Sequence, residues 1–372
     1  MKHSFRLILL LAGALLSGSC ARQEHVPTNR QDSITWQQEQ WIASGQEFLR
    51  RTDPETRAET LGAIDAALEA IAGTSQPLED GQHWSTHRDG QEVTADFRLK
   101  EEGEPLEVSR EWHRLGTEEV ETVRYISIPL RGGFTIRKDG REMADVTLDL
   151  QGRDANRDGL LGTEDELELT VEAVAADFSY ALSPCRLTGG EVAFTLLFSA
   201  HDGALMRLTA QTHGLRLEKR EKTLDYPYWD ESFRYAETFI DADAIDLEAD
   251  FPAGIHARGS VDSQPFRAAL RRISPEMNEE EVRALCEEAS ACLHISLFYE
   301  DNLEEPRAAL TILPVHILNR YDDYWTWEAG LLFPGGLSCS LEAFFNSSRY
   351  DSLKSDFRSF LQRLQVFMPY SF

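Results

Sequence analysis

The sequence predicts an α+β protein in which a large antiparallel β-sheet, a meander of hairpins, is combined with two N-terminal helices and with helices in the C-terminal third. Three observations predict this class. Apolar residues have helical spacing at both ends of the chain, whereas they alternate with polar residues between Trp84 and Phe251. Asp-Gly pairs, which favour tight hairpin turns, interrupt the alternating region. Helices kept apart from an antiparallel sheet are typical of the α+β class.

Two helices are expected near the N-terminus. The first begins at about Ser33, where the apolar residues Ile34, Trp41 and Phe48 recur every seven positions. The second lies in TDPETRAETLGAIDAALEAIAGT, where Asp53 serves as the cap, Pro54 suits the first helical position and Gly73 ends the helix. Its predicted apolar face consists of Leu61, Ile64, Leu68 and Ile71.

Hairpins follow the helices. Their strands show a twofold pattern, for example in the alternation of Val192, Phe194, Leu196 and Phe198 with other residues. The acidic segment DADAIDLEAD also alternates, which predicts a strand with one wet and one dry face. Because both central residues of a type I′ turn need positive φ, the expected turns are the pairs Asp89-Gly90, Asp139-Gly140 and Asp202-Gly203.

The last third of the chain mixes helices and strands. A helix is expected in SPEMNEEEVRALCEEASACL, capped by Ser274, with Val282, Leu285, Ala289 and Leu293 facing inward. Strands are expected in AALTIL and YWTWEAGLLF. A closing helix is predicted to use a core stripe of Tyr350, Leu353, Phe357, Phe360, Leu361 and Leu364.

The first twenty residues predict export and lipidation. MKHSFRLILLLAGALLSGSC has a basic tip and an apolar run from Leu7 to Leu16, which is too short to span a bilayer and is typical of a signal peptide. The ending LSGSC resembles a bacterial lipobox, so Cys20 is the predicted lipidation site, carrying palmitate-type acyl chains. The expected organisation is a signal peptide at 1–19, a lipidated tether at 20–32 and one α+β domain at 33–372, or two parts, 33–252 and 253–372, divided near 252.

The net charge restricts the classes of partner that the protein can bind. The formal net charge of −27 disfavours nucleic acid and anionic lipid headgroups. The expected partners are the membrane, reached through the N-terminal lipid, and an envelope protein or small ligand.

The cysteines after Cys20 are Cys185, Cys286, Cys292 and Cys339. The oxidising envelope permits one or two disulfides among them, three full pairings stay open, and the lack of a CxxC pair argues against structural zinc.

No common catalytic motif occurs: GxSxG, GxxxxGK[ST], HExxH and GxGxxG are all missing. His83 and His87 are four residues apart, but they precede an Asp-Gly hairpin, and on a strand that spacing separates them by about 13 Å. The aromatic clusters DYPYWDESFRY and RYDDYWTWEAG offer rings that stack on sugars. Their alternation favours packing in a core or on a sheet face.

The segment DANRDGLLGTED, residues 154–165, resembles a twelve-position calcium loop. The predicted ligands are Asp154, Asn156, Asp158, the Leu160 carbonyl and Asp165, with Gly159 at the sharp turn. Its flanks are strand-like, which predicts a strand-loop-strand site and no EF-hand helix pair. The alternative is an acidic hairpin loop without a metal. A bound calcium ion would be structural, with an affinity on the order of 10⁻⁴–10⁻³ M.

The layout resembles uncharacterised lipoproteins of Bacteroidetes-type bacteria. The resemblance rests on the order lipobox, paired helices and long β-meander, and on the segments EEEVRALCEEASACLHISLFY and FPGGLSCSLEAFFNSSRYDSLKSDFRSFL. It implies a location in the cell envelope and transfers no active-site residue.

Taken together, these features predict a lipid-anchored envelope protein with a binding or scaffolding role and no enzymatic one. The alternatives are a carbohydrate-acting hydrolase, which would need two carboxylates roughly 5–10 Å apart in a cleft, and a carrier of a hydrophobic ligand. Outer-membrane anchoring with the protein facing the periplasm is expected.

Overall fold

The computed structural model describes residues 31–72, 79–115, 118–160, 162–200, 203–226, 231–318 and 322–367 of the 372-residue chain. It confirms the α+β class, with two N-terminal helices, antiparallel sheet and C-terminal helices. The predicted signal peptide, Cys20 and most of the predicted tether lie outside the described residues.

The chain forms two compact units whose segments alternate along the sequence. Unit 1 comprises Met1–Ala58, Asp202–Ala210 and Asp243–Phe372, and unit 2 comprises Glu59–His201 and Gln211–Ala242. The predicted division near 252 stays a prediction. The first helix, however, belongs with the C-terminal part of the chain and not with the strands that follow it.

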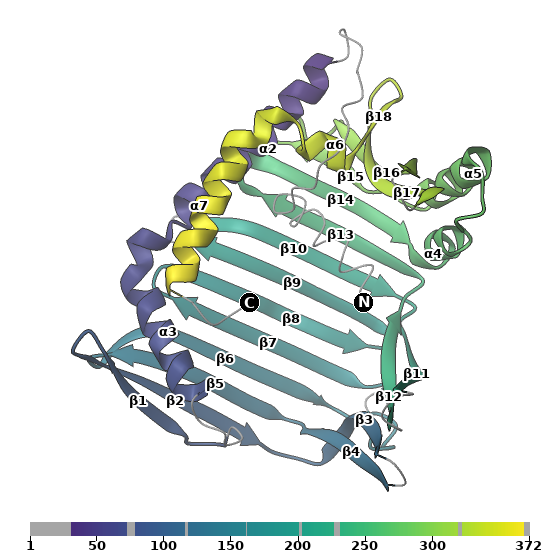
Figure 1. Cartoon of the computed structure of the whole chain (residues 1–372). Helices are drawn as coiled ribbons and strands as arrows, with labels where there is room; N and C mark the ends of the chain where they lie inside the picture. The colour runs from purple at the N-terminus through teal and green to yellow at the C-terminus, as the bar shows by residue number, and fades with distance from the viewer. Residues whose placement is uncertain are drawn as a thin grey trace. The chain divides into compact units, whose positions relative to one another are not determined.

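Seven strands of unit 2 pair in the order β1-β2-β5-β6-β7-β8-β9 (Figure 1). All neighbours are antiparallel, and they are successive hairpins except for β2 and β5, between which β3 and β4 intervene in the sequence. Their bounds are β1 His83–Arg88, β2 Gln91–Glu101, β5 Leu130–Lys138, β6 Arg141–Arg153, β7 Glu166–Ala175, β8 Phe178–Thr188 and β9 Glu191–Ala200.

Two of the three predicted Asp-Gly turns are confirmed. Positive φ angles occur at both central residues of each, at 53° and 78° for Asp89 and Gly90 and at 47° and 77° for Asp139 and Gly140. These are the angles that a type I′ turn requires. In the third pair, Asp202 lies outside the described residues.

Unit 2 contains a second sheet, in the order β11-β12-β3-β4. The strands are β3 Pro105–Leu115, β4 Glu118–Ser127, β11 Arg216–Tyr226 and β12 Glu231–Asp241. Leu106 at the start of β3 packs with Ile128 and with Leu150 of β6 in a buried cluster. The residues that open this second sheet therefore share a core with the first.

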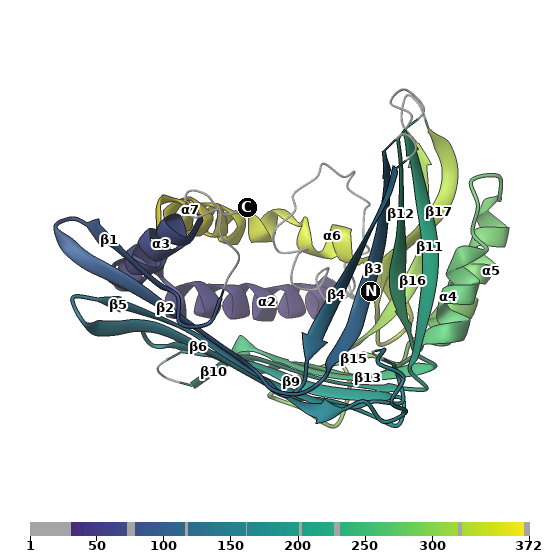
Figure 2. The same cartoon turned by 90° about the horizontal axis from the view of Figure 1, so that it is seen from below.

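Helix α3 (Ala58–Ala72) packs on one end of the seven-strand sheet through small residues (Figure 2). The buried cluster contains Ala63, Ala66, Ala67, Trp84, Val93, Ala95, Ile136, Met143 and Ala144. Ile64 and Ile71 join it as predicted, but the expected role of Leu68 is wrong, since that side chain is 42% exposed. Alanines let the helix approach the sheet closely, and this rotates Leu68 outward.

Unit 1 holds the remaining strands, except for the last three residues of β10, in the order β10-β13-β14-β15-β16-β17-β18. They are β10 Gly203–His213, β13 Ala244–Phe251, β14 Ile255–Asp262, β15 Ser296–Tyr299, β16 Ala308–Leu318, β17 Asp323–Phe333 and β18 Leu337–Ser340. In β13, the wet-and-dry pattern predicted for DADAIDLEAD is confirmed, because Leu247 and Ala249 are buried while Asp246 and Glu248 are exposed.

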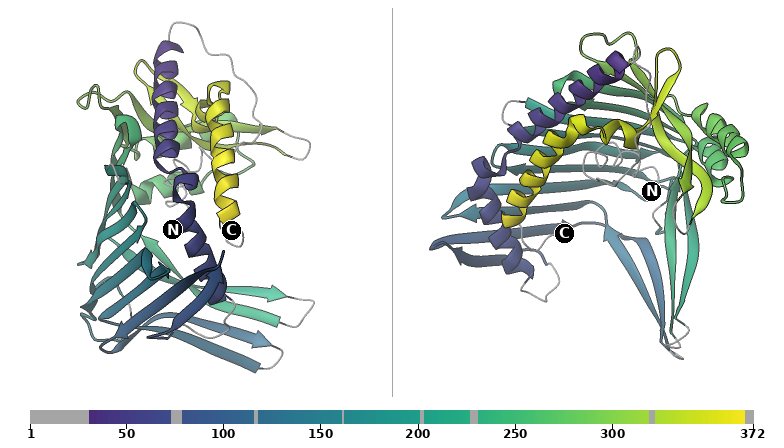
Figure 3. Two further views of the ribbon diagram at one scale, coloured as in Figure 1. Left: turned by 90° about the vertical axis from the view of Figure 1, so that its left-hand side faces the viewer. Right: turned by 45° about the horizontal axis from the view of Figure 1, so that its top comes forward.

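The helical elements of unit 1 are α2 Gln31–Arg51, η1 Pro54–Arg57, η2 Pro252–Gly254, α4 Ser263–Arg271, α5 Glu279–Ser290, α6 Leu341–Phe345, η3 Ser348–Tyr350 and α7 Asp351–Phe367. Both panels of Figure 3 show α2 and α7 side by side, and the rings of Phe48 and Phe357 stack between them at 6.3 Å. Asp53 accepts a hydrogen bond from the Glu55 backbone N–H, as expected of a cap. Leu361, predicted in the core stripe of α7, is exposed instead.

The predicted cap of the central C-terminal helix is also wrong. Asn278, and not Ser274, caps α5: its side chain accepts from the Glu281 N–H, and the Glu281 side chain accepts from the Asn278 N–H. This reciprocal pair is a capping box. The helix begins at the position where a side chain and its partner satisfy two backbone donors.

The four cysteines of the described residues, Cys185, Cys286, Cys292 and Cys339, are free thiols, so no disulfide forms among them. Burial raises the pKa of the Cys286 thiol to about 11. Among the described helices, none is both long and apolar enough to cross a membrane.

Candidate functional site

The predicted calcium loop connects β6 to β7 in unit 2, so the expected strand-loop-strand arrangement is confirmed. Its base is closed by a two-pronged ion pair, in which the Arg153 guanidinium donates to the Glu166 carboxylate at 2.9 and 2.6 Å. Hydrogen bonding to Arg153 lowers the pKa of Glu166. The loop is therefore held at both strand ends before any ion is considered.

The first half of the loop is a series of side-chain turns. Asp154 accepts hydrogen bonds from the backbone N–H groups of Arg157, at 2.6 Å, and Gly159, at 2.8 Å. Asn156 accepts from the Asp158 N–H, and Asp158 accepts from the Leu160 N–H. Positive φ angles at Arg157 and Gly159, 61° and 74°, make the sharp bend that the sequence predicts at the glycine.

The second half of the loop turns on Asp165, which is fully buried. Its carboxylate accepts from the backbone N–H groups of Ala155, at 3.1 Å, and Gly162, at 2.8 Å, and so joins the two ends of the loop. The Gly159 carbonyl accepts from the Glu107 N–H of β3 at 2.8 Å. The loop is consequently fixed to the second sheet as well as to its own strands.

The predicted ligand side chains lie in one loop, and their oxygens accept hydrogen bonds from backbone N–H groups. Within the described part of the chain, which omits Leu161 in this loop, no three His, Cys, Asp or Glu side chains are grouped to hold a metal ion. Calcium binding would require some of these carboxylate oxygens to exchange N–H donors for the ion. The calcium site thus stays a prediction.

The other sequence candidates that the structure describes lie on strands. His83 and His87 lie on strand β1, and the His83 Nδ1 is 2.7 Å from Asp96 Oδ1. Trp325 of β17 stacks on His316 of β16, with ring centroids 4.8 Å apart. The DYPYWDESFRY cluster includes residues 227–230, which lie outside the described residues.

A different feature, which the search for motifs missed, is the sheet surface over β7, β8 and β9. Cross-strand pairing places Val171 opposite Leu182, and Leu182 opposite Leu196. Tyr180 likewise lies between Ala173 and Phe198, and the rings of Phe178 and Phe198 stack at 5.6 Å. We call this set the apolar face: Val171, Ala173, Phe178, Tyr180, Leu182, Leu196 and Phe198.

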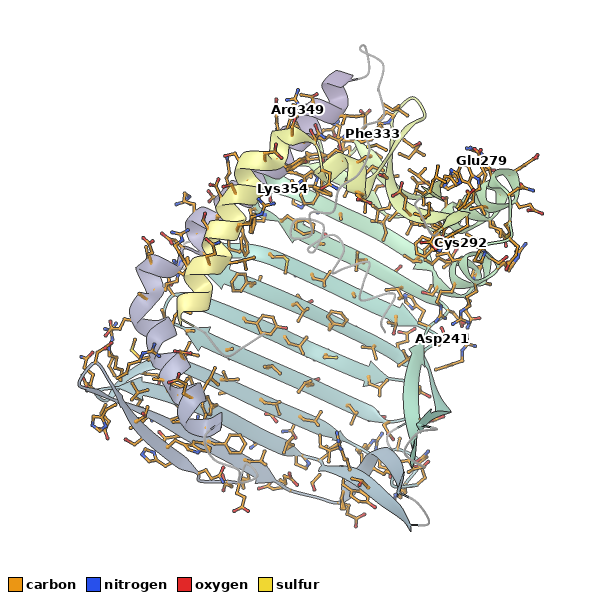
Figure 4. All side chains as sticks on the ribbon, viewed as in Figure 1. Asp241, Glu279, Cys292, Phe333, Arg349 and Lys354 are labelled. Atoms are coloured by element: carbon orange, nitrogen blue, oxygen red, sulfur yellow. The ribbon has the colours of Figure 1, made fainter. Side chains whose placement is uncertain are left out.

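The apolar face is only half-buried. Tyr180 is 39% exposed, and the other members are intermediate between buried and exposed. Figure 4 shows the side chains that stand on the strands of the sheet. The same side of the sheet is fully buried farther along, where Ala144 and Ile136 pack under α3. The apolar side of the sheet thus extends from the buried cluster under α3 to the half-buried residues on β7, β8 and β9.

The opposite side of the same sheet is polar. Because successive side chains alternate between the two faces, the residues between members of the apolar face point the other way. Cross-strand ion pairs lie on that opposite side at other positions of the sheet: Arg98–Asp145, Arg131–Asp149 and Arg186–Glu168. The members of the apolar face carry no charge, and these ion pairs lie on the side of the sheet opposite to it.

Comparison of the chain with protein-family models, curated proteins and solved structures finds no match.

Proposed function

We propose that the protein is a lipid-anchored binding module of the bacterial cell envelope, and that its apolar face takes up the hydrocarbon part of an amphiphilic ligand. The single observation that carries this proposal is the half-buried apolar face on a sheet whose other face is lined with ion pairs. A water-soluble protein that leaves such a surface partly open has an apolar partner for it.

The chemistry of the face favours an acyl chain. None of its members carries a charge, so attraction would come from burial of hydrocarbon, at about 0.8 kcal/mol for each methylene removed from water. The Tyr180 hydroxyl is the one polar atom among these side chains, and it is suited to contact the polar end of an amphiphile. Flexible hydrocarbon adapts to a surface built from rings and branched side chains without needing directional bonds.

The backbone argues against a peptide that adds as an extra strand. Strand β7 is paired with β6 and β8, and strand β8 is paired with β7 and β9. Their backbone N–H and C=O groups are therefore used within the sheet, whereas strand addition needs a free edge. A ligand on this face meets side chains only.

The test measures binding of 11-(dansylamino)undecanoic acid, a fluorescent acyl probe, to the purified protein. We expect saturable binding that Tyr180→Asp weakens at least tenfold, which corresponds to about 1.4 kcal/mol. Val174→Asp is the matched control, because Val174 lies on the neighbouring strand, is 49% exposed and points to the polar face. No saturable binding by the wild type, or equal losses in the two variants, would refute the acyl-binding role.

The anchoring part of the proposal rests on the lipobox-like LSGSC. Acylation of Cys20 would hold the protein stably on a membrane, since more than one acyl chain is needed for lasting attachment. We place it on the outer membrane, facing the periplasm. Cys20→Ala is expected to leave the precursor uncut by lipoprotein signal peptidase and to remove the protein from the membrane fraction. Normal membrane retention of this variant would show that the anchor lies elsewhere.

We further propose that calcium stabilises the loop at residues 154–165, with oxygen ligands from Asp154, Asn156, Asp158, Asp165 and the Leu160 carbonyl. Four of these oxygens come from residues already gathered by the loop's hydrogen bonds. An ion that binds only the folded form adds RT ln(1 + [L]/Kd), or about 1.4 kcal/mol at ten times Kd. Magnesium, which demands octahedral geometry, should have a smaller effect.

The calcium test compares thermal unfolding in chelator, millimolar calcium and millimolar magnesium. We expect a calcium-dependent rise in Tm that Asp154→Ala and Asp158→Ala remove. Glu164→Ala is the matched control, because Glu164 is an exposed acid of the same loop outside the predicted ligand set. A wild-type Tm that calcium does not change would leave the loop as an acidic turn between two strands.

A further inference from the structure

The second sheet of unit 2 consists of two hairpins that share a short ladder. Strands β3 and β4 form one hairpin, β11 and β12 form the other, and the four strands stand side by side (Figure 2). Between the hairpins, residues 111–115 of β3 pair with residues 231–235 of β12, next to the two hairpin turns. A two-stranded hairpin alone is marginally stable in water, so the order of this sheet depends on what joins its two hairpins.

A series of backbone hydrogen bonds joins the hairpins at their other ends. Near the start of β3, the Glu107 N–H donates to the Gly159 carbonyl of the 154–165 loop at 2.8 Å. On the far side of that loop, the Thr163 carbonyl accepts from the Gly190 N–H of the β8–β9 turn at 3.2 Å. The Gly190 carbonyl in turn accepts from the N–H of Leu215, immediately before β11, at 2.7 Å. Glu107 and Leu215 are both buried, which makes the loss of these bonds costly.

The Asp165 side chain holds the loop in the shape that this series requires. Its buried carboxylate accepts from the Ala155 N–H with one oxygen and from the Gly162 N–H with the other. Gly162 precedes Thr163, so the second bond fixes the chain beside the carbonyl that meets the β8–β9 turn. Gly190 has a φ of 77°, a conformation that suits glycine, at the position that both donates and accepts in the series.

We propose that the 154–165 loop and the β8–β9 turn act as a clasp: they hold the β3–β4 and β11–β12 hairpins together, and opening of the loop releases the second sheet. The coupling rests on backbone hydrogen bonds within unit 2 and does not depend on the acyl-binding or calcium proposals. An ion held by the loop would act on the second sheet through the clasp, because it would fix the segment that carries the bridging carbonyls.

The first test is hydrogen exchange of the purified protein in chelator, followed peptide by peptide, so that calcium has no part in the result. We expect Asp165→Asn to speed exchange in the β3–β12 ladder by about tenfold or more, because asparagine has one oxygen to accept and its amide N–H₂ would face the second backbone donor. Strands β1 and β2, which pack under α3, should keep their wild-type rates. Glu164→Gln is the matched control, since it makes the same chemical change at the adjacent, exposed acid. An unchanged ladder, or an equal acceleration in β1 and β2, would overturn the proposal.

The second test needs no variant, and it decides the question if Asp165→Asn does not fold. Exchange of single amides of the wild-type protein is followed by NMR at low urea concentrations, where local openings are separated from global unfolding. The amides of Glu107, Gly190 and Leu215 should exchange through the same opening as the β3–β12 ladder, with the same dependence on urea, and before those of β1 and β2. A ladder that stays protected while these three amides exchange would show that the loop and turn do not hold the second sheet.

Discussion

The ion pair between Arg88 and Asp65 ties α3 to the edge strand β1, and breaking it should destabilise unit 2 markedly. Asp65 lies on the sheet-facing side of α3 and is 4% exposed, and the Arg88 guanidinium donates to its carboxylate. That hydrogen bond raises the pKa of Arg88, and the nearby carboxylates of Glu69 and Asp89 add to the effect. Arg88→Met would remove the cation that pairs with Asp65 and leave that carboxylate buried without it.

The size of the loss follows from the exposure of the two side chains. Removing one partner of a fully buried pair costs about 3–5 kcal/mol. The Arg88 side chain is 36% exposed, so water replaces part of the lost interaction, and a hydrogen bond to a charged group is worth about 1.5–3 kcal/mol. We therefore expect Arg88→Met to lose about 2 kcal/mol, which lowers the Tm of a unit of this size by about 4–8 °C.

The assay is urea unfolding of three variants, followed by circular dichroism. The double variant Asp65→Leu/Arg88→Met removes both charges, and we expect it to recover at least half of the loss, because no unpaired charge remains. Arg186→Met is the control, since it breaks the exposed pair with Glu168 and should cost at most about 1 kcal/mol. A loss for Arg88→Met no larger than that for Arg186→Met would refute the reasoning.

Three further predictions follow from single residues. Burial raises the pKa of Cys286 to about 11, from about 8.5 in the unfolded chain. The unfolded thiol therefore loses its proton first, and the free energy of unfolding should fall as the pH rises between these two values. Cys286→Ala should flatten that part of a curve of stability against pH. Asn278→Ala removes the capping box of α5 and should cost about 1 kcal/mol in urea unfolding, more than Ser274→Ala. Gly259→Ala should be severely destabilising in the same assay, because its Cβ would lie 1.9 Å from the His294 carbonyl oxygen.

Strand periodicity and turn chemistry are the parts of the fold that sequence reasoning predicts well. In β13 the alternation of apolar and acidic residues correctly predicts that Leu247 and Ala249 are buried. The Asp89-Gly90 turn is equally local, since its positive φ angles are a property of the two residues themselves. Features of this kind need no knowledge of distant parts of the chain.

The packing of α3 depends on its tertiary neighbours and was predicted less well. Large apolar residues suggested a face that included Leu68, but the sheet accepts the alanine side, and Asp65 lies on that side because Arg88 pairs with it. The partner that makes a buried aspartate acceptable is 23 positions away. Helical spacing within α3 contains no information about that residue.

The loop at residues 154–165 shows a second limit of prediction from sequence, which concerns metal binding. Asp, Asn and Gly are favoured in calcium loops because they bend the chain and present oxygens, and they are favoured in metal-free turns because those oxygens accept backbone N–H groups. Asp154 and Asp158 have the second kind of bond here. One sequence pattern therefore serves both structures, and only the response to the ion separates them.

The apolar face was hidden from sequence reasoning for a related reason. Alternation shows that one side of β7 to β9 is apolar, but it does not show what covers that side. The buried cluster under α3 ends at Ala144, with Ala175 at its margin, and the face from Ala173 to Phe198 lies beyond it. Because the charges of these strands are collected into ion pairs on the opposite side, even a strongly acidic chain presents an uncharged surface there. The net charge of the chain therefore does not report the composition of one sheet face, which depends on the alternation of side chains along each strand.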